Sequence, residues 1–252
     1  MIKTGIVSVT FRELDVDQVI KLVKNASLSG IEWGGDIHVP HGDIDKAEIV
    51  RKKTEEAGLE IAGYGSYYRL GCENEVEFEE VLNTAEALGA PVIRVWAGNR
   101  GTNKADQVWW NKIIAESERI AVMAQKKGID IAYEYHKNSL TDSSESTLKL
   151  LKNVGKNNLS TYWQPPVETD FEENIEGLKK VLSEIYNVHV HYWQNGERLA
   201  LSQGKESWSG YLEEISKIPG KRFAMLEFVK NGTIEQFKED ALVLNNLVKK
   251  FN

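Results

Sequence analysis

The sequence has few of the features that mark secreted or membrane proteins. Among its 252 residues there is one cysteine, Cys72, so no internal disulfide can form, which suits a reducing compartment. No apolar run approaches the roughly 20 residues that a membrane-spanning helix needs. The first residues lack the basic, apolar and small-residue regions of a signal peptide. These absences predict a cytoplasmic protein with no membrane partner.

Positive charge is also in short supply. The chain has 31 Lys and Arg against 38 Asp and Glu, which gives a formal net charge of -7. Broad binding to nucleic acid needs a basic face, so no nucleic-acid partner is expected. With 41% hydrophobic and 27% charged residues, the composition is that of an ordinary globular protein. No shift in composition marks a domain boundary, and we predict one domain over residues 1–252.

What the sequence does contain is a regular alternation of short apolar strands and amphipathic helices. Asp15 and Gln18 have the spacing of a capping box before the first apolar helical stripe. Eight strands are predicted near residues 5, 31, 61, 93, 131, 161, 188 and 224. Strict alternation favours a parallel sheet, and eight units in this length predict a single (β/α)8 TIM barrel rather than an open doubly wound sheet.

Four glycines are expected to separate a helix from the next strand. The last turn of a helix is commonly closed by a residue with left-handed backbone, which glycine adopts without strain. These glycines are Gly30, Gly58, Gly89 and Gly128.

Metal-binding side chains occur at the C-terminal ends of four predicted strands. They are Glu134, Gln164, His191 and Glu227. Alternate side chains of a strand share a face, and TIM barrels carry their chemistry at this end. Glu134 and Glu227 should therefore point inward, where an unpaired carboxylate is costly and a cation removes the cost. Oxygen ligands with one imidazole favour a single Mn²⁺ or Mg²⁺ ion, and Co²⁺ or catalytic Zn²⁺ would also fit.

Eight further side chains near these strand ends are expected to contact a substrate. Arg94 has an equally good alternative role as the partner of an inward acid such as Glu32. His189 points inward but deeper than His191, which favours a supporting or substrate-side role over metal ligation. The polar segment 194–207 reads as a flap over the site. The predicted substrate-binding residues are His38, Tyr64, Arg94, Trp96, His136, His189, Trp193 and Arg198.

At these strand ends the chain resembles the xylose-isomerase-like TIM barrels of the sugar phosphate isomerase/epimerase group. The resemblance rests on four fragments: Gly30-Ile31-Glu32-Trp33, Glu134-Tyr135-His136, His189-Val190-His191 and Leu226-Glu227. It implies one divalent metal ion held by Glu134, a ligand on the sixth strand, His191 and Glu227.

The sixth strand departs from the family pattern. The family usually has aspartate there, often with histidine three residues later, whereas this chain has Gln164 and Val167. Glutamine can donate a carbonyl oxygen but brings no negative charge. Weaker metal binding is therefore expected.

The expected function is that of a metal-dependent isomerase or epimerase acting on a small sugar, sugar phosphate or inosose. A divalent ion that bridges a carbonyl and a neighbouring hydroxyl stabilises an enediolate, while Glu134 and Glu227 act as acid and base. A dehydratase of the 3-dehydroshikimate type and a non-catalytic carbohydrate-binding relative are the alternatives. An endonuclease IV-like nuclease needs several zinc ions, which five histidines disfavour. The sequence is compatible with a homo-oligomer but does not require one.

Overall fold

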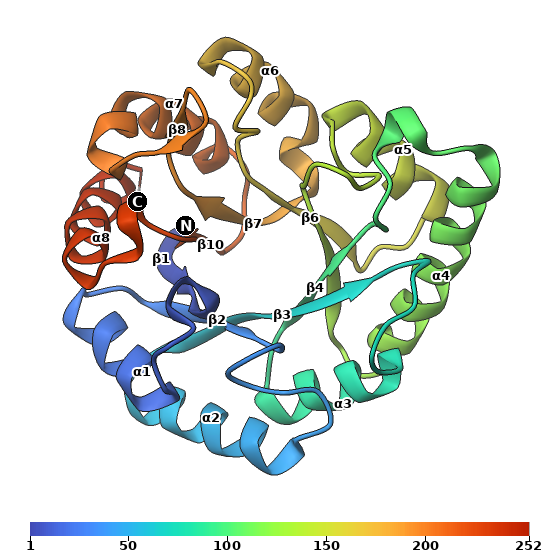
Figure 1. Ribbon diagram of the computed structural model, residues 1–252, viewed down its shortest axis with the longest axis horizontal. Helices are drawn as coiled ribbons and strands as arrows, with labels where there is room; N and C mark the ends of the chain where they lie inside the picture. Colours follow the sequence, from blue (N-terminus) through green and yellow to red (C-terminus); the bar gives the residue numbers. More distant parts are fainter. Residues whose placement is uncertain (252) are drawn as a thin grey trace.

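The computed structural model describes residues 1–251. Within this range eight parallel strands close into a barrel, and helices surround it (Figure 1). The barrel strands are β1 (Ile2–Val7), β2 (Gly30–Gly34), β3 (Glu60–Arg69), β4 (Val92–Trp96), β5 (Asp130–Glu134), β6 (Leu159–Trp163), β7 (Ile185–Val190) and β10 (Arg222–Leu226). The helices are α1 (Val16–Asn25), α2 (Ile44–Glu56), α3 (Phe78–Leu88), α4 (Gln107–Gln125), α5 (Ser144–Val154), α6 (Phe171–Val181), α7 (Lys205–Ser216) and α8 (Ile234–Val248). The predicted TIM barrel is confirmed.

The barrel closes where β1 pairs with β10. Ile2 to Ile6 lie opposite Arg222 to Leu226 in parallel register. On its other edge β1 pairs with β2, so that no barrel strand has a free edge. The catalytic end of such a barrel is the end where all eight strands terminate.

Short elements decorate that end of the barrel. A two-stranded hairpin of β8 (Trp193–Gln194) and β9 (Glu197–Arg198) follows β7. Its turn residues Asn195 and Gly196 have φ of 51° and 77°, the left-handed pair of a type I′ turn. The 3₁₀ helices at this end are η1 (Ser8–Phe11), η2 (Thr102–Lys104), η4 (Leu201–Gly204) and η5 (Lys230–Gly232), whereas η3 (Leu182–Glu184) directly precedes β7 at the other end. The segment expected as a flap is thus this hairpin, η4 and the start of α7.

The hydrophobic core has two layers. The larger layer lies between the strands and the helices and includes Trp33, Tyr64 and Trp163. The smaller one fills the barrel itself and includes Ala132 and Met225, which share strand faces with Glu134 and Glu227. The polar centre at the barrel mouth therefore rests on an apolar floor.

Helix starts follow the predicted capping chemistry. The Asp15 side chain accepts from Gln18 N, and the Gln18 side chain accepts from Asp15 N, which confirms the capping box before α1. A cap of this kind contributes about 1 kcal/mol. Thr233 caps α8 by accepting from Gln236 N.

One of the four glycine predictions is wrong. The left-handed residue after α1 is Ser27, with φ of 54°, and Gly30 is already the first residue of β2. Gly30 is needed for space, because a Cβ there would lie 2.4 Å from Phe223 Cε1 inside the barrel. Three glycines adopt the predicted left-handed backbone: Gly58, Gly89 and Gly128.

Candidate active site

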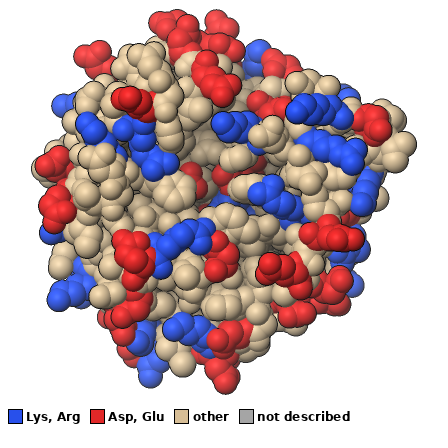
Figure 2. Space-filling view, in the orientation of Figure 1, with Lys and Arg blue, Asp and Glu red and all other residues tan. Residues whose placement is uncertain are grey.

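The mouth of the barrel is a hollow in which charges of both signs meet. Figure 2 shows it at the centre of this face, with basic and acidic side chains around and inside it. An open groove of about 690 Å³ lies between α2 and α3, but its charged residues, such as Glu48, Arg51 and Glu86, are exposed. Among residues 1–251, none of the helices has the length and apolarity to cross a bilayer. Buried charges single out the mouth as the candidate site.

Arg94 forms the middle of the buried charge network. Its Nε donates to Glu32 Oε1 at 2.8 Å and its Nη1 donates to Glu134 Oε2. All three side chains are at most 4% exposed. Burial alone would lower the pKa of Arg94, but Glu134 and Glu32 raise it, so the guanidinium stays charged. The alternative role for Arg94, as the partner of Glu32, is confirmed.

A glycine makes room for this ion pair. On β3 the residues that face the barrel interior are Gly63 and Gly65, and a Cβ on Gly65 would lie 2.7 Å from Arg94 Nη2 and 2.9 Å from Glu32 Oε1. The intervening Tyr64 faces the helix layer instead. Side-chain volume missing on β3 is thus filled by charged groups from β2 and β4.

The Glu134 carboxylate accepts hydrogen bonds from residues of β4 and from the residue that follows β6. Besides Arg94, Trp96 Nε1 donates to its Oε2 at 2.5 Å and Gln164 Nε2 donates to its Oε1 at 3.2 Å. The same Gln164 nitrogen donates to Tyr135 O at 2.8 Å. These donors fix the position of the carboxylate at the end of β5.

His189 lies on the opposite side of the centre, between two acids. Its Nδ1 is 3.3 Å from Glu227 Oε2 and its Nε2 is 3.8 Å from Glu32 Oε1, yet neither nitrogen has a hydrogen-bond partner within residues 1–251. Burial would lower the pKa of His189, but Glu227 and Glu32 raise it to about 10. In turn, burial would raise the pKa of Glu227, whereas the charge of His189 lowers it to about 2. Without a metal ion this pair is therefore ionised.

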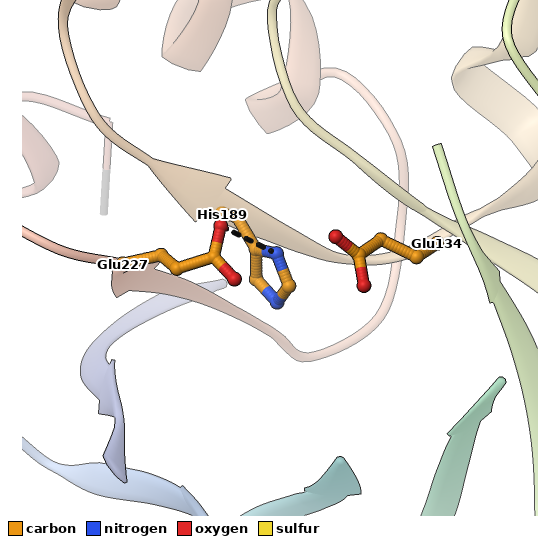
Figure 3. A group of neighbouring side chains, drawn as sticks. All are labelled: Glu134, His189 and Glu227. Atoms are coloured by element: carbon orange, nitrogen blue, oxygen red, sulfur yellow. Dashed lines mark ion pairs between the residues drawn. The ribbon is translucent and has the colours of Figure 1, made fainter. Parts of the chain in front are cut away.

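Glu134, His189 and Glu227 form a group of three buried side chains that converge on one point. One ligand atom from each lies within 4.8 Å of the others. Figure 3 shows Glu134 on one side and Glu227 on the other, with both carboxylates directed toward the imidazole of His189. Two carboxylates and an imidazole are donors that a divalent ion accepts.

The predicted ligands His191 and Gln164 lie next to this group. His191 Nε2 is 3.2 Å from Gln164 Oε1, and the Gln164 amide reaches Glu134 as described above. Burial lowers the pKa of His191 to about 4, and its Nδ1 has no partner among the described residues. Trp208 Nε1 donates to His191 O at 2.8 Å and fixes this strand end. The four predicted ligands thus lie in one region, and the group that converges on one point contains two of them, Glu134 and Glu227, together with His189.

Four of the predicted substrate-binding residues line the entrance to the centre. Trp96 and His136 stack with centroids 4.6 Å apart and planes 17° from parallel. Trp193 and Arg198 face each other across the hairpin, with the guanidinium 4.7 Å from the ring centroid. The buried Arg94 and His189 contact the two acids directly, Arg94 at Glu134 and His189 at Glu227.

Two of the predicted substrate-binding residues are engaged elsewhere. His38 is 3% exposed, and its ring nitrogens lie 2.9 Å from Ser8 Oγ and 3.0 Å from Leu14 O. Tyr64 donates its hydroxyl to Val39 O at 2.8 Å behind the sheet. Both side chains hold the connection from β2 to α2 against its neighbours, so the structure does not bring them to the centre.

The structure also shows aromatic residues at the mouth that sequence reasoning missed. Tyr67 and Phe228 have left-handed backbone, with φ of 58° and 55°, which for bulky side chains costs about 1–3 kcal/mol. The Tyr67 ring lies 5.1 Å from the Arg94 guanidinium and 6.0 Å from the Trp96 ring. Burial raises the pKa of the Tyr67 hydroxyl to about 12. Strain of this kind is typical of ligand-binding positions.

Comparisons with known proteins agree with this fold. The family model described as xylose isomerase-like TIM barrel matches residues 20–247. The structure of the probable 3-DHS dehydratase AsbF from Bacillus anthracis is 19% identical, with a TM-score of 0.81 over 97% of this chain and 99% of that chain. The D-psicose 3-epimerase from Clostridium cellulolyticum H10 is 14% identical, with a TM-score of 0.75 over 99% of both chains. An L-ribulose 3-epimerase is 14% identical, with a TM-score of 0.71 over 100% of this chain and 96% of that chain. No curated protein matches the sequence.

Proposed function

Because the chain belongs to the xylose isomerase-like TIM barrel family, we propose that it is a metal-dependent isomerase or epimerase of a small sugar-like substrate. The observation that carries this proposal is the placement of two carboxylates, Glu134 and Glu227, on opposite sides of one buried centre. A substrate carbon held between them has an acid–base group on each face.

The residues present fit a divalent metal ion. Glu134, His189 and Glu227 would hold it, with His191 and the Gln164 carbonyl as further ligands. Support comes from the mixed oxygen and nitrogen donors and from the buried nitrogens of His189 and His191 that lack partners within residues 1–251. When bound, the ion would polarise a substrate carbonyl and acidify the neighbouring C–H bond.

The chain's own residues would move the proton. Glu227 accepts a proton from one face of the substrate carbon, and Glu134 serves the other face. Return of the proton to the opposite face of the same carbon gives epimerisation, and return to the neighbouring carbon gives isomerisation. Arg94 and Trp96 keep Glu134 in place, while the aromatic side chains of Tyr67 and Trp96 offer an apolar wall to a sugar ring.

A dehydratase is the second candidate, and His136 favours it. Its ring stacks on Trp96, and Trp96 in turn donates to the Glu134 carboxylate. The His136 Nδ1 donates to Lys137 O at 2.6 Å. The other ring nitrogen, Nε2, is left for substrate. Expulsion of a β-hydroxyl as water needs one base that takes the proton from the carbon and one acid that protonates the leaving oxygen, and His136 would supply that acid.

Proton exchange in D₂O tests the proposal and separates the two candidates. Protein with measured Mn²⁺ content is incubated with ketoses, inososes and 3-dehydroshikimate. An epimerase incorporates deuterium at the inverted carbon, whereas a dehydratase yields a product that has lost water. Glu134→Gln and Glu227→Gln should abolish either activity. Glu60→Gln is the control, because Glu60 lies outside the mouth and forms ion pairs with Lys3 and Lys221. Absence of exchange and turnover in fully metal-loaded protein would contradict the proposal.

A further inference from the structure

The hairpin at the barrel mouth carries a positive charge that has no counter-ion. Arg198 is the last residue of β9, and its buried Nε has no hydrogen-bond partner among residues 1–251. No carboxylate in this range forms an ion pair with it. Leaving a partly buried guanidinium unpaired is costly, so a group that completes it is expected from outside the chain.

Two other arginines at the mouth differ from Arg198 in having carboxylate partners. Arg12 pairs with Asp36 at 2.6 Å, and Arg94 pairs with Glu32 and Glu134. The charges of these two are balanced within the protein, whereas Arg198 forms no ion pair among residues 1–251.

The Arg198 guanidinium is held in place without being neutralised. It lies 4.7 Å from the centroid of Trp193 and 4.9 Å from the centroid of Phe228. The type I′ turn described above sets the hairpin, and Leu199 N donates to Tyr192 O at 2.9 Å directly after it. Phe228 reaches this position with strained, left-handed backbone. Aromatic contacts orient a guanidinium while leaving its N–H groups free to bind a planar anion.

Arg198 also lies close enough to the centre for its charge to act there. The Phe228 ring that it contacts belongs to the residue directly after Glu227. The free guanidinium is thus on the β7 and β10 side of the mouth, beside Glu227. A substrate that reaches Glu227 passes within range of it.

We propose that Arg198 binds an oxyanion of the substrate, and that the substrate is an acidic polyol rather than a neutral sugar. A carboxylate fits the planar fork of one guanidinium through two parallel hydrogen bonds. A phosphate ester offers the same oxyanion chemistry and is distinguished by the test. The inference rests on the proposed function only in taking the barrel mouth as the substrate site.

Three ligands with the same six-carbon chain test this inference. D-gluconate carries a carboxylate, D-glucitol carries no charge, and D-glucitol 6-phosphate carries a phosphate. Calorimetric titration of Mn²⁺-loaded protein should show gluconate binding about tenfold tighter than glucitol, since a charged hydrogen-bonded pair contributes about 1.5 kcal/mol or more. A preference for the phosphate over gluconate would assign the oxyanion to a phosphate ester.

The variants must show that Arg198 causes the preference. Arg198→Gln, at equal Mn²⁺ content, should lose it and bind all three ligands as weakly as glucitol. Arg198→Lys keeps the positive charge without the planar fork and should retain only part of the preference for anions. This variant also tests the inference if Arg198→Gln does not fold. Arg100→Gln is the matched control, because Arg100 lies 4.4 Å from the Trp109 ring but is exposed.

Two results would overturn the inference: equal affinity of the wild type for gluconate, the phosphate and glucitol, or a preference that persists in Arg198→Gln. Its failure is separable from that of the proposed function. If the wild type and Arg198→Gln turn over neutral sugars equally well, the anion site alone is refuted. Arg198-dependent binding without proton exchange on any substrate would refute the proposed reaction alone.

Discussion

The two sides of the barrel mouth hold their carboxylates in different ways. On the β4 and β5 side, Glu134 accepts hydrogen bonds from Arg94, Trp96 and Gln164. On the β7 and β10 side, the one ion pair of the Glu227 carboxylate within residues 1–251 is with His189 Nδ1, at 3.3 Å and without hydrogen-bond geometry. The first side is built as a fixed support. The second keeps donors and acceptors free for a ligand, and it is the side where Arg198 lies.

The largest effect is expected from removal of the cation that supports the first side. Arg94→Met would leave Glu32 and Glu134 buried without a partner and should lower the free energy of unfolding by about 3–5 kcal/mol. Urea unfolding of metal-free protein measures this. Arg100→Met is the control. A loss below 1 kcal/mol would show that the centre does not depend on Arg94.

The two acids should differ in what they lose. Glu227→Gln and Glu134→Gln should each lower kcat by about a thousandfold, as expected for loss of an acid–base group. Glu134→Gln should lower the stability of the metal-free protein more than Glu227→Gln, because Arg94 keeps its charge when Glu134 is replaced, whereas His189 can release its proton when Glu227 is replaced. Paired kinetic and unfolding measurements test this. Equal stability losses would contradict the distinction between the two sides.

The two histidines should give opposite pH dependence in metal-free protein. His191 has a pKa of about 4 in the folded state, below the ordinary value, so the unfolded chain binds more protons between about pH 6.5 and 4 and stability falls as pH falls. His189 has a folded pKa of about 10, so the folded chain holds more protons between about pH 6.5 and 10 and stability falls as pH rises. The acid limb should amount to roughly 3 kcal/mol and the wider alkaline limb to roughly 5 kcal/mol.

Asparagine variants assign these limbs. His191→Asn should flatten the acid limb, and His189→Asn the alkaline limb, in unfolding curves recorded across the pH range. An alkaline limb that survives in His189→Asn would show that another group holds the proton.

The smallest effect concerns Gln164, which connects the two sides. Gln164→Asp adds a negative charge near the ligands, worth a few kcal/mol at an effective dielectric near 20 before desolvation is subtracted. It should tighten Mn²⁺ binding, while Gln164→Ala should weaken it. The metal-free form of Gln164→Asp should be less stable, because the amide donor to Glu134 is lost. Equal Mn²⁺ affinity in wild type and both variants, by calorimetry, would show that Gln164 is not a ligand.

The sequence was sufficient for the barrel and for the general location of the site. Each β–α unit is local, so periodicity, capping residues and glycines reveal it without knowledge of the tertiary structure. Strand alternation also placed Glu134 and Glu227 inward, because the face of a residue depends only on its parity within the strand.

Other features depended on information that periodicity does not contain. The alternation of side chains along β7 gives the face on which His189 and His191 lie, but not how deep in the barrel each side chain is. That depth decides which carboxylates each histidine contacts. Tyr67 was missed because β3 continues to Arg69 through a register shift after Gly65. Alternation fails at such an irregularity. The free charge of Arg198 is visible only once the positions of all acids around it are known.

The seam between β1 and β10 has a consequence for synthesis of the protein. Thr4 donates to Asn245 Oδ1 at 2.7 Å across 241 residues of sequence, and β1 waits for β10 to cover its second edge. During translation that edge stays unpaired until β10 has left the ribosome. Glu227 directly follows this strand, which closes the seam. A nascent chain therefore cannot bring Glu134, His189 and Glu227 together before its barrel is complete.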